Sequence, residues 1–319
     1  MRVGAKTRIM CGLGLVLAGP LMALAPARAA TAVPAVDSPL APVDVVEVSG
    51  LIDRISADSI RTSIARSEKN GAQAVILQVN TRGAVIGRDA MTSVLSDIKN
   101  SKIPVAIWVG PSGARLYGLP AQMVAVADVA AMAPGTRIGR TGTLLNVDGA
   151  AVSFGAADDM LHTGTLGFLE AREQKVLKFA GDDRGVPVLR NMLLAMDGLT
   201  VKGRTLDTVY DSLGDSGQVD RAATETRFFK LGLVPRLFHT VASPSSGYLL
   251  ATVGLALLLF EFFTAGVGVA GLVGAVCLLF GTMGFGAMPM NGTAVVLFIL
   301  AFVAFAVDVQ VGVPRFWTG

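Results

Sequence analysis

The fold is decided by one stretch, Trp108 to Gly139, which reads WVGPSGARLYGLPAQMVAVADVAAMAPGTRIG. It begins at the end of an apolar strand, IPVAIWVG, passes a Gly-Ala turn, and continues as an apolar helix, GARLYGLPAQMVAVAD. A second short apolar strand, VAAMA, follows this helix. A strand, a helix and a strand in succession predict a parallel sheet that is covered by helices.

The neighbouring residues continue this alternation. Residues 43–52, VDVVEVSGLI, predict a strand, and residues 56–71 predict an amphipathic helix with a serine cap and a glycine stop. The near-continuous apolar run at 72–80 predicts a strand that is buried on both faces. Another helix is predicted at 87–102, whereas the aperiodic Gly- and Ala-rich residues 135–167 predict a long surface loop. The soluble part is therefore expected to be an α/β domain.

The composition indicates a membrane protein with a soluble part. Of the 319 residues, 52% are hydrophobic and 16% are charged, which is too apolar for an ordinary soluble domain. The net charge of +3 gives no basis for nucleic-acid binding. The two cysteines, Cys11 and Cys277, lie in separate apolar stretches, and the Cys and His spacing fits no metal site. We therefore expect no disulfide, metal or cofactor.

The N-terminus predicts an exported protein. Residues 1–29 have a positively charged start, an apolar run and the small-x-small cleavage site ARA, which are the three parts of a secretory signal. The alternative is an uncleaved anchor helix. A Pro/Ala linker follows at 30–42. We then expect an extracytoplasmic domain at 43–244 and a transmembrane region at 245–319.

Three apolar segments follow the soluble part, at residues 248–263, 266–286 and 293–307. Each is long enough, or nearly so, to cross a bilayer core of about 30 Å. Gly266, Ala270 and Gly274 repeat at four-residue spacing, which predicts a closely packed helix face. Glu261 ends the first segment and is either a functional acid within the membrane or an interfacial side chain.

Several of these segments resemble one family. VVEVSGLID, AVILQVNTRGA, IPVAIWVGPSGA, VAAMAPGTRIG and EFFTAGVGVAGLVGAVCLL are similar to segments of the NfeD family, and the resemblance extends from Val43 to about Val309. The family consists of membrane-bound proteins with a ClpP-like serine protease domain, often associated with stomatin-type proteins. The resemblance implies an α/β ClpP/crotonase-like soluble domain, followed by an α-helical transmembrane region of about three helices.

The resemblance also implies where a catalytic dyad should lie. The family protease uses a serine at a helix N-terminus and a lysine, because the hydroxyl needs access to substrate and a base that removes its proton. Alignment through PSGA and MAPGT places the serine position on Gly118, with Tyr117 and Leu119 adding bulk beside it. The lysine position falls on Gly167 or within a residue or two of it. Both members of the dyad are missing, which favours a lapsed active site.

Other side chains offer weaker alternatives. Ser112 is the fallback nucleophile, although a hydroxyl in a Pro-Ser-Gly turn has a simpler structural role. Lys175 and Lys178 are expected on a downstream helix as solvated charges. His162 with Asp158–Asp159 imitates part of a Ser-His-Asp set, but these residues fall in the predicted loop, where local polar contacts are the simpler interpretation.

A backbone oxyanion donor is implied after the second strand, in the segment Thr81–Ala84. Gly83 would offer its N–H to a developing negative charge, with Ala84 beside it lining the groove. Arg82 stands where the family has proline. The alternative is an ordinary turn from a strand to a helix.

Three functions follow from these observations. The first is a non-catalytic NfeD relative, whose domain binds a peptide or partner by strand addition within a membrane assembly. The second is an active membrane serine protease that cleaves apolar segments of a stomatin-like partner. The third is a structural or transport-related platform. The resemblance implies a homo-oligomer in the cell membrane with a stomatin- or flotillin-like partner, and an extracytoplasmic location leaves no acyl-CoA cofactor for the domain.

Overall fold

A computed structural model of the chain describes residues 40–178, 185–213, 219–230, 232–241, 243–264, 268–286 and 292–311. All of these residues belong to one compact unit, Asp37–Gly319. The predicted signal peptide at residues 1–29 and the linker up to residue 39 lie outside the described residues.

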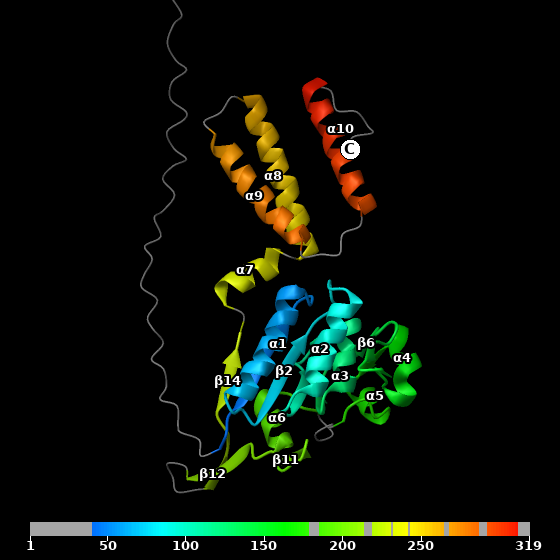
Figure 1. Cartoon of the computed structure of the whole chain (residues 1–319), viewed down its shortest axis with the longest axis vertical. Helices are drawn as coiled ribbons and strands as arrows, with labels where there is room; N and C mark the ends of the chain where they lie inside the picture. The colour runs from blue at the N-terminus through cyan, green and yellow to red at the C-terminus, as the bar shows by residue number, and fades with distance from the viewer. Residues whose placement is uncertain are drawn as a thin grey trace, which may run out of the picture. The chain divides into compact units, whose positions relative to one another are not determined.

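The centre of the soluble part is a five-stranded sheet in the order β14-β1-β2-β3-β5. Its strands are β1 (Val43–Ser49), β2 (Ala74–Asn80), β3 (Val105–Val109), β5 (Val129–Met132) and β14 (Thr226–Phe229). Every pairing in this sheet is parallel (Figure 1). All residues of β3 are buried, as expected for a parallel strand with both faces covered. The predicted α/β domain, followed by apolar helices, is confirmed.

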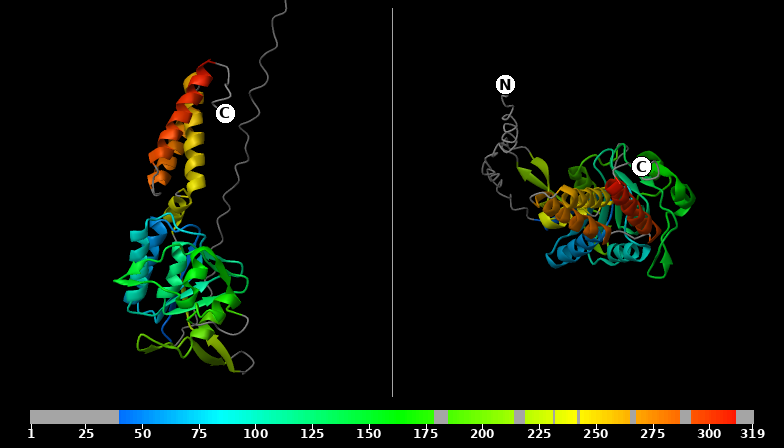
Figure 2. Two further views of the ribbon diagram at one scale, coloured as in Figure 1. Left: turned by 90° about the vertical axis from the view of Figure 1, so that its right-hand side faces the viewer. Right: turned by 90° about the horizontal axis from the view of Figure 1, so that it is seen from above.

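Helices cover both faces of the sheet. On one face, α1 (Arg54–Lys69) packs beside α2 (Arg88–Asn100), as Figures 1 and 2 show. On the other face, α6 (Leu189–Met196) buries its apolar side against β1, β2 and β3. The predicted serine cap of α1 is wrong, because Asp53 is the N-cap and accepts the Ser56 N–H at 2.8 Å.

The stretch after β3 differs from the predicted continuous helix. It forms β4 (Arg115–Tyr117), the 3-10 helix η1 (Leu119–Gln122) and the short α3 (Met123–Val126). Gly118 has a φ of +74°, a conformation that interrupts a helix, and Pro120 then starts the next turn. The chain therefore changes direction at Gly118 instead of continuing helically.

The predicted surface loop at 135–167 is also wrong, because this segment is structured. It contains β6 (Arg137–Gly139), β7 (Asn146–Val147), β8 (Ala150–Ala151), η2 (Gly155–Ala157), α4 (Asp158–Thr163) and β9 (Thr165–Gly167). Its apolar side chains, such as Leu145, Phe154 and Leu161, are buried in the main hydrophobic core. Short elements with isolated apolar residues leave no periodic pattern in the sequence.

β4, β6 and β9 form a separate three-stranded sheet in the order β4-β6-β9. The remaining elements of the soluble part are α5 (Phe168–Glu173), β10 (Thr200–Val201), β11 (Arg204–Thr205), β12 (Val209–Leu213), β13 (Val219–Ala223) and α7 (Leu233–Val241). The pairs β10–β11 and β12–β13 are antiparallel.

The three predicted apolar segments each form a helix: α8 (Pro244–Thr264), α9 (Val269–Gly286) and α10 (Gly292–Val311). By length and composition, α8 and α9 are suited to cross a membrane, and α10 contains a shorter apolar segment, Gly292–Ala304. α8 and α9 are in close contact because glycines face each other. A Cβ atom on Gly274 would lie 2.8 Å from the carbonyl oxygen of Gly254. The predicted packing role is therefore confirmed for Gly274, whereas Gly266 lies outside the described residues.

Glu261 has a structural role at the turn between α8 and α9. Its Oε1 accepts the Gly268 N–H at 2.6 Å, and its Oε2 accepts the Gly271 N–H at 3.3 Å. The first N–H groups of a helix have no partner within the helix, and an acidic side chain there also interacts favourably with the helix dipole. Glu261 therefore caps the start of α9.

Candidate functional site

The position implied for the serine lies beside the position implied for the oxyanion donor. Gly118 directly follows β4, and its N–H donates to the Gly139 carbonyl oxygen at 3.1 Å. A Cβ atom on Gly118 would lie 3.4 Å from the Cα of Gly83. Two segments that are 35 positions apart in the sequence, 118 minus 83, thus meet at the two positions that the family resemblance implies.

The backbone at Gly83 is already hydrogen bonded. Its N–H donates to Thr81 Oγ1 at 3.2 Å, and the Thr81 hydroxyl donates to the Gly83 carbonyl oxygen at 2.7 Å. The same carbonyl accepts the Ile52 N–H at 3.0 Å, and Ala84 is bridged to Ile52. An oxyanion at this point would have to compete with Thr81 for the Gly83 N–H.

The position implied for the lysine lies farther away. Gly167 ends β9 and donates its N–H to Glu170 Oε2 at 2.7 Å. In the β4-β6-β9 sheet, Tyr117 and Thr165 both lie level with Gly139, whereas Gly167 lies level with Arg137. Gly118 and Gly167 are thus offset by three residues along the strands and lie two strand spacings apart across the sheet. These spacings give roughly 14 Å between their Cα atoms.

Thr165 lies nearer to the level of Gly118, at roughly 10 Å by the same spacings. It is two residues before Gly167 and therefore within the range implied by the alignment. Its Oγ1 accepts a hydrogen bond from Arg137 Nε at 2.9 Å. Neither of these positions offers an amine that could act as a base.

The fallback residues are not brought together. Ser112 is exposed in the turn between β3 and β4. Lys175 is exposed beyond α5, which ends at Glu173, so the expected longer helix is wrong at this point. Lys178 donates to the Ala127 carbonyl oxygen at the amino end of β5, whereas Gly118 lies beyond the carboxyl ends of the strands. Desolvation lowers the pKa of the Lys178 amine, although the residue is exposed, and no serine hydroxyl is hydrogen bonded to it among the described residues.

The histidine of the 158–162 segment does not form a catalytic set. His162 is exposed on α4. Asp158 instead accepts hydrogen bonds from the Ser153 hydroxyl at 2.7 Å and from the Phe154 N–H at 2.5 Å. Within the described ranges, no three His, Cys, Asp or Glu side chains gather in an arrangement suited to a metal ion.

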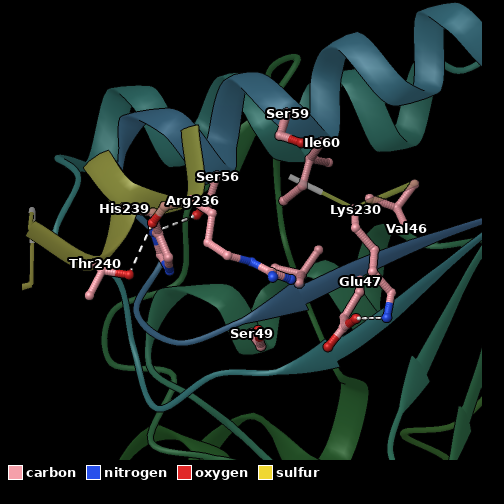
Figure 3. A pocket seen from close by; sticks show the side chains of 11 residues that line it. Val46, Glu47, Ser49, Ser56, Ser59, Ile60, Lys230, Arg236, His239 and Thr240 are labelled. Carbon is pink, nitrogen blue, oxygen red and sulfur yellow. Dashed lines mark hydrogen bonds and ion pairs between the residues drawn. The ribbon is translucent and has the colours of Figure 1, made fainter. Parts of the chain in front are cut away.

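The structure reveals a polar cluster that the sequence analysis missed. His239 Nδ1 on α7 lies 2.9 Å from Asp53 Oδ2 and 3.2 Å from Ser56 Oγ. Figure 3 shows the contact with Ser56. In a Ser-His-Asp triad, the acid and the serine contact opposite ring nitrogens. Here both contact Nδ1, while Nε2 faces the backbone at Ser49 and Gly50. The cluster therefore connects α7 to the start of α1 and lacks the geometry of a proton relay.

Both ionisable groups of this cluster are shifted. The hydrogen bond with Asp53 raises the pKa of His239 above its ordinary value of 6.5. Burial acts to raise the pKa of Asp53, but hydrogen bonds from His239 and Ser56 outweigh it and hold that pKa below 3.8. The ion pair therefore forms across mildly acidic and near-neutral pH.

We expect the contact between α7 and α1 to weaken at alkaline pH. Because the pKa of His239 is raised in the folded state, its contribution is complete below pH 6.5 and is lost as pH rises through the folded value. The contribution of Asp53 is present above pH 3.8 and is lost as pH falls through its folded value. Hydrogen exchange of the α7 amides, corrected for the intrinsic rate, should show lower protection at pH 8.5 than at pH 5.5. His239→Gln should remove this difference, and an unchanged pH dependence in that variant would contradict the assignment.

An open cleft of about 610 Å³ lies next to the position implied for the lysine. Gly167, Phe168 and Leu169 line one part of it, and Arg115 and Arg137 line another. Leu169 is 61% exposed, so its side chain is free to contact a ligand in the cleft. Glu170 also lines the cleft and lies 3.8 Å from the Arg137 guanidinium, so it balances part of the positive charge. The cleft therefore offers apolar contacts and charged groups of both signs to a ligand.

Comparison with known proteins gives the relatives of this chain. Residues 246–318 match the NfeD integral membrane domain. The chain is 25% identical over 288 residues to the membrane-bound protease PH1510 of Pyrococcus horikoshii. The alignment covers 83% of this chain and 63% of the relative. The chain thus spans less than two thirds of that relative's length.

Two solved structures show similarity to the soluble part. The 1510-N membrane protease specific for a stomatin homolog from Pyrococcus horikoshii is 22% identical, with 64% of this chain and 100% of that chain covered and a TM-score of 0.49. A mutant of the 1510-N membrane-bound stomatin-specific protease, in complex with a substrate peptide, is 21% identical, with 64% and 99% covered and a TM-score of 0.49. Residues 246–318 are therefore an NfeD integral membrane domain, and the chain is a membrane protein that is homologous to a membrane-bound protease.

Proposed function

We propose that this chain is a non-catalytic NfeD protein, whose α/β domain binds an extended peptide or partner protein without cutting it. One observation carries the proposal: the residue beside Gly83, where the family places its nucleophile, is Gly118. Glycine has no side chain and cannot form an acyl intermediate. Gly167 likewise supplies no base.

The hydroxyls near this point support the same proposal. The Thr81 hydroxyl donates to the Gly83 carbonyl oxygen, and Thr165 Oγ1 accepts from Arg137 Nε. Activation of a hydroxyl requires a base that accepts its proton, and neither threonine contacts an amine, imidazole or carboxylate in the described structure. These hydroxyls therefore hold backbone and side chains in place.

The cleft beside Gly167 supports retained binding. The exposed Leu169 suits the apolar side chains of a peptide. Arg115 and Arg137 suit its acidic side chains or its backbone carbonyl groups. Because relatives act on a stomatin homologue, we propose a stomatin- or flotillin-like membrane protein as the partner. We further propose that residues 43–244 lie outside the cytoplasm, that residues 245–319 anchor the protein, and that the chain assembles as a homo-oligomer.

The second candidate is an active serine protease with a displaced dyad. The close approach of Gly118 to Gly83 favours it, because the framework of a protease site is kept there. Such an enzyme would need another nucleophile, for which Ser112 is the fallback, and a base brought to it by a rearrangement. The third candidate, a structural platform, has no comparable observation in its favour.

The test follows binding and cleavage of the same peptide. The full chain in lipid nanodiscs is mixed with a fluorescent peptide from an apolar segment of a stomatin-like protein, and anisotropy and mass spectrometry are recorded. We expect binding without cleavage. Leu169→Asp should weaken binding at least about 10-fold, as for a central contact of an interface. Leu194→Asp, at a partly exposed leucine on α6, is the matched control and should bind as the unsubstituted chain does. Specific cleavage would refute the proposal.

A further inference from the structure

A second cavity lies between β1, α1 and α7, apart from the cleft at Gly167. Its volume is about 280 Å³. The side chain of Arg236 extends from α7 into it, with His239 on one side and the Lys230–Glu47 pair on the other (Figure 3). The hydroxyls of Ser49 and Ser59 also line it. We propose that this cavity binds the phosphate group of an anionic membrane lipid.

The charge of the cavity matches a phosphate diester. Lys230 is paired with Glu47 at 3.3 Å, and His239 is paired with Asp53 at 2.9 Å. In the part of the chain that the structure describes, the Arg236 guanidinium makes no ion pair or side-chain hydrogen bond, so one positive charge is uncompensated. A phosphate diester carries one negative charge, and a guanidinium binds it through two parallel hydrogen bonds.

The hydroxyls complete the site. Ser49 lies on β1 and Ser59 on α1, both line the cavity, and each can donate a hydrogen bond to a phosphate oxygen. A carboxylate has two oxygens in one plane, whereas a phosphate diester has two charged oxygens and two ester oxygens in a tetrahedral arrangement, so it can accept hydrogen bonds from arginine and from hydroxyls on different elements at once. The distribution of donors therefore favours phosphate.

The position of α7 favours a lipid over a free anion. Arg236 lies nine residues before Ser245, where the first membrane-suited segment begins. α7 ends at Val241, only three residues before α8 begins at Pro244, and a long arginine side chain near the start of a membrane segment can reach a lipid headgroup. Leu237, next to Arg236, is 52% exposed, and Tyr248 is 48% exposed. Exposed apolar and tyrosine side chains beside a cation are typical of the membrane interface.

The test uses the purified full chain in neutral detergent. Binding of dioctanoyl phosphatidylglycerol, dioctanoyl phosphatidylcholine and inorganic phosphate is measured by native mass spectrometry and by microscale thermophoresis. We expect phosphatidylglycerol to bind at least about 10-fold more tightly than the other two probes. Arg236→Gln should lose this preference, and Arg236→Lys should keep part of it because lysine also binds phosphate as a point charge.

Arg204→Gln is the matched control, because Arg204 is exposed on β11 and does not line the cavity. It should bind phosphatidylglycerol as the unsubstituted chain does. Arg236 is exposed, so Arg236→Gln should unfold at an unchanged temperature without lipid. If the Arg236→Gln variant binds phosphatidylglycerol as tightly as the unsubstituted chain does, the proposed site is wrong. If the unsubstituted chain binds inorganic phosphate as tightly as phosphatidylglycerol, the ligand is not a lipid. Neither result depends on whether the domain has lost proteolysis.

Discussion

Replacing Arg227 by methionine is expected to lower the free energy of unfolding of the soluble domain by about 3–5 kcal/mol. Arg227 Nε donates to Asp44 Oδ1 at 2.6 Å, and the two residues are direct neighbours on β14 and β1. The Asp44 side chain is fully buried, at 0% exposure, and its second oxygen has no partner in the described structure. Without Arg227, this carboxylate is left buried and unpaired, which is far more costly than losing an exposed pair.

Denaturant unfolding of the full chain in detergent, followed through the buried Trp108, would measure this effect. Arg61→Met is the control, because the Arg61–Asp97 pair is 48% and 39% exposed and should contribute no more than about 1 kcal/mol. The double variant Asp44→Leu with Arg227→Met should recover most of the loss, since apolar side chains can replace a buried ion pair. Equal, small effects of Arg227→Met and Arg61→Met would contradict the buried pair. Loss of the Arg227–Asp44 pair should also affect the position of α7, because α7 is the next helix after β14.

Gly281→Leu is expected to separate α8 from α9. A Cβ atom on Gly281 would lie 2.7 Å from the backbone nitrogen of Ala251, and backbone atoms cannot move aside as a flexible side chain can. Overpacking of a tight contact costs about 1–3 kcal/mol, and leucine at a contact between two backbones should reach the upper end of this range. The packing between helices in lipid depends on such close approach, because lipid tails are as apolar as the side chains.

The measurement is the SDS fraction at which the helices lose their contact in mixed micelles, followed by energy transfer between dyes on α8 and α9. Gly286→Leu is the matched control, because it lies on the same helix and a Cβ atom there would have open space around it. We expect a clearly lower midpoint for Gly281→Leu and an unchanged midpoint for Gly286→Leu. Equal midpoints would show that the two helices do not touch at Gly281.

The strands and long helices could be predicted from the sequence because their apolar patterns are local. The buried run at 72–80 became β2, and the helix predicted at 87–102 became α2. The start of α1 was missed because Asp53 precedes the serine that resembled a cap. The helix expected after Ala114 was wrong because Leu116 is buried as a strand residue before the chain turns at Gly118.

The candidate site could be predicted only in part. The family resemblance identified Gly83 and Gly118, and the structure places them together, but whether they ever act in chemistry stays a prediction. The cluster of Asp53, Ser56 and His239 joins residues more than 180 positions apart, so no local spacing could reveal it. The unpaired charge of Arg236 depends equally on which side chains pair with its neighbours in three dimensions.

Covalent labelling distinguishes a domain that has lost proteolysis from a working serine protease. The full chain in nanodiscs is treated with a fluorophosphonate probe, which reacts only with an activated serine, and any adduct is located by mass spectrometry. A chain unfolded by heat is labelled in parallel to measure background. We expect no adduct above background on the folded chain. A stoichiometric adduct at one serine, such as Ser112, that disappears when this serine is replaced by alanine would contradict this expectation.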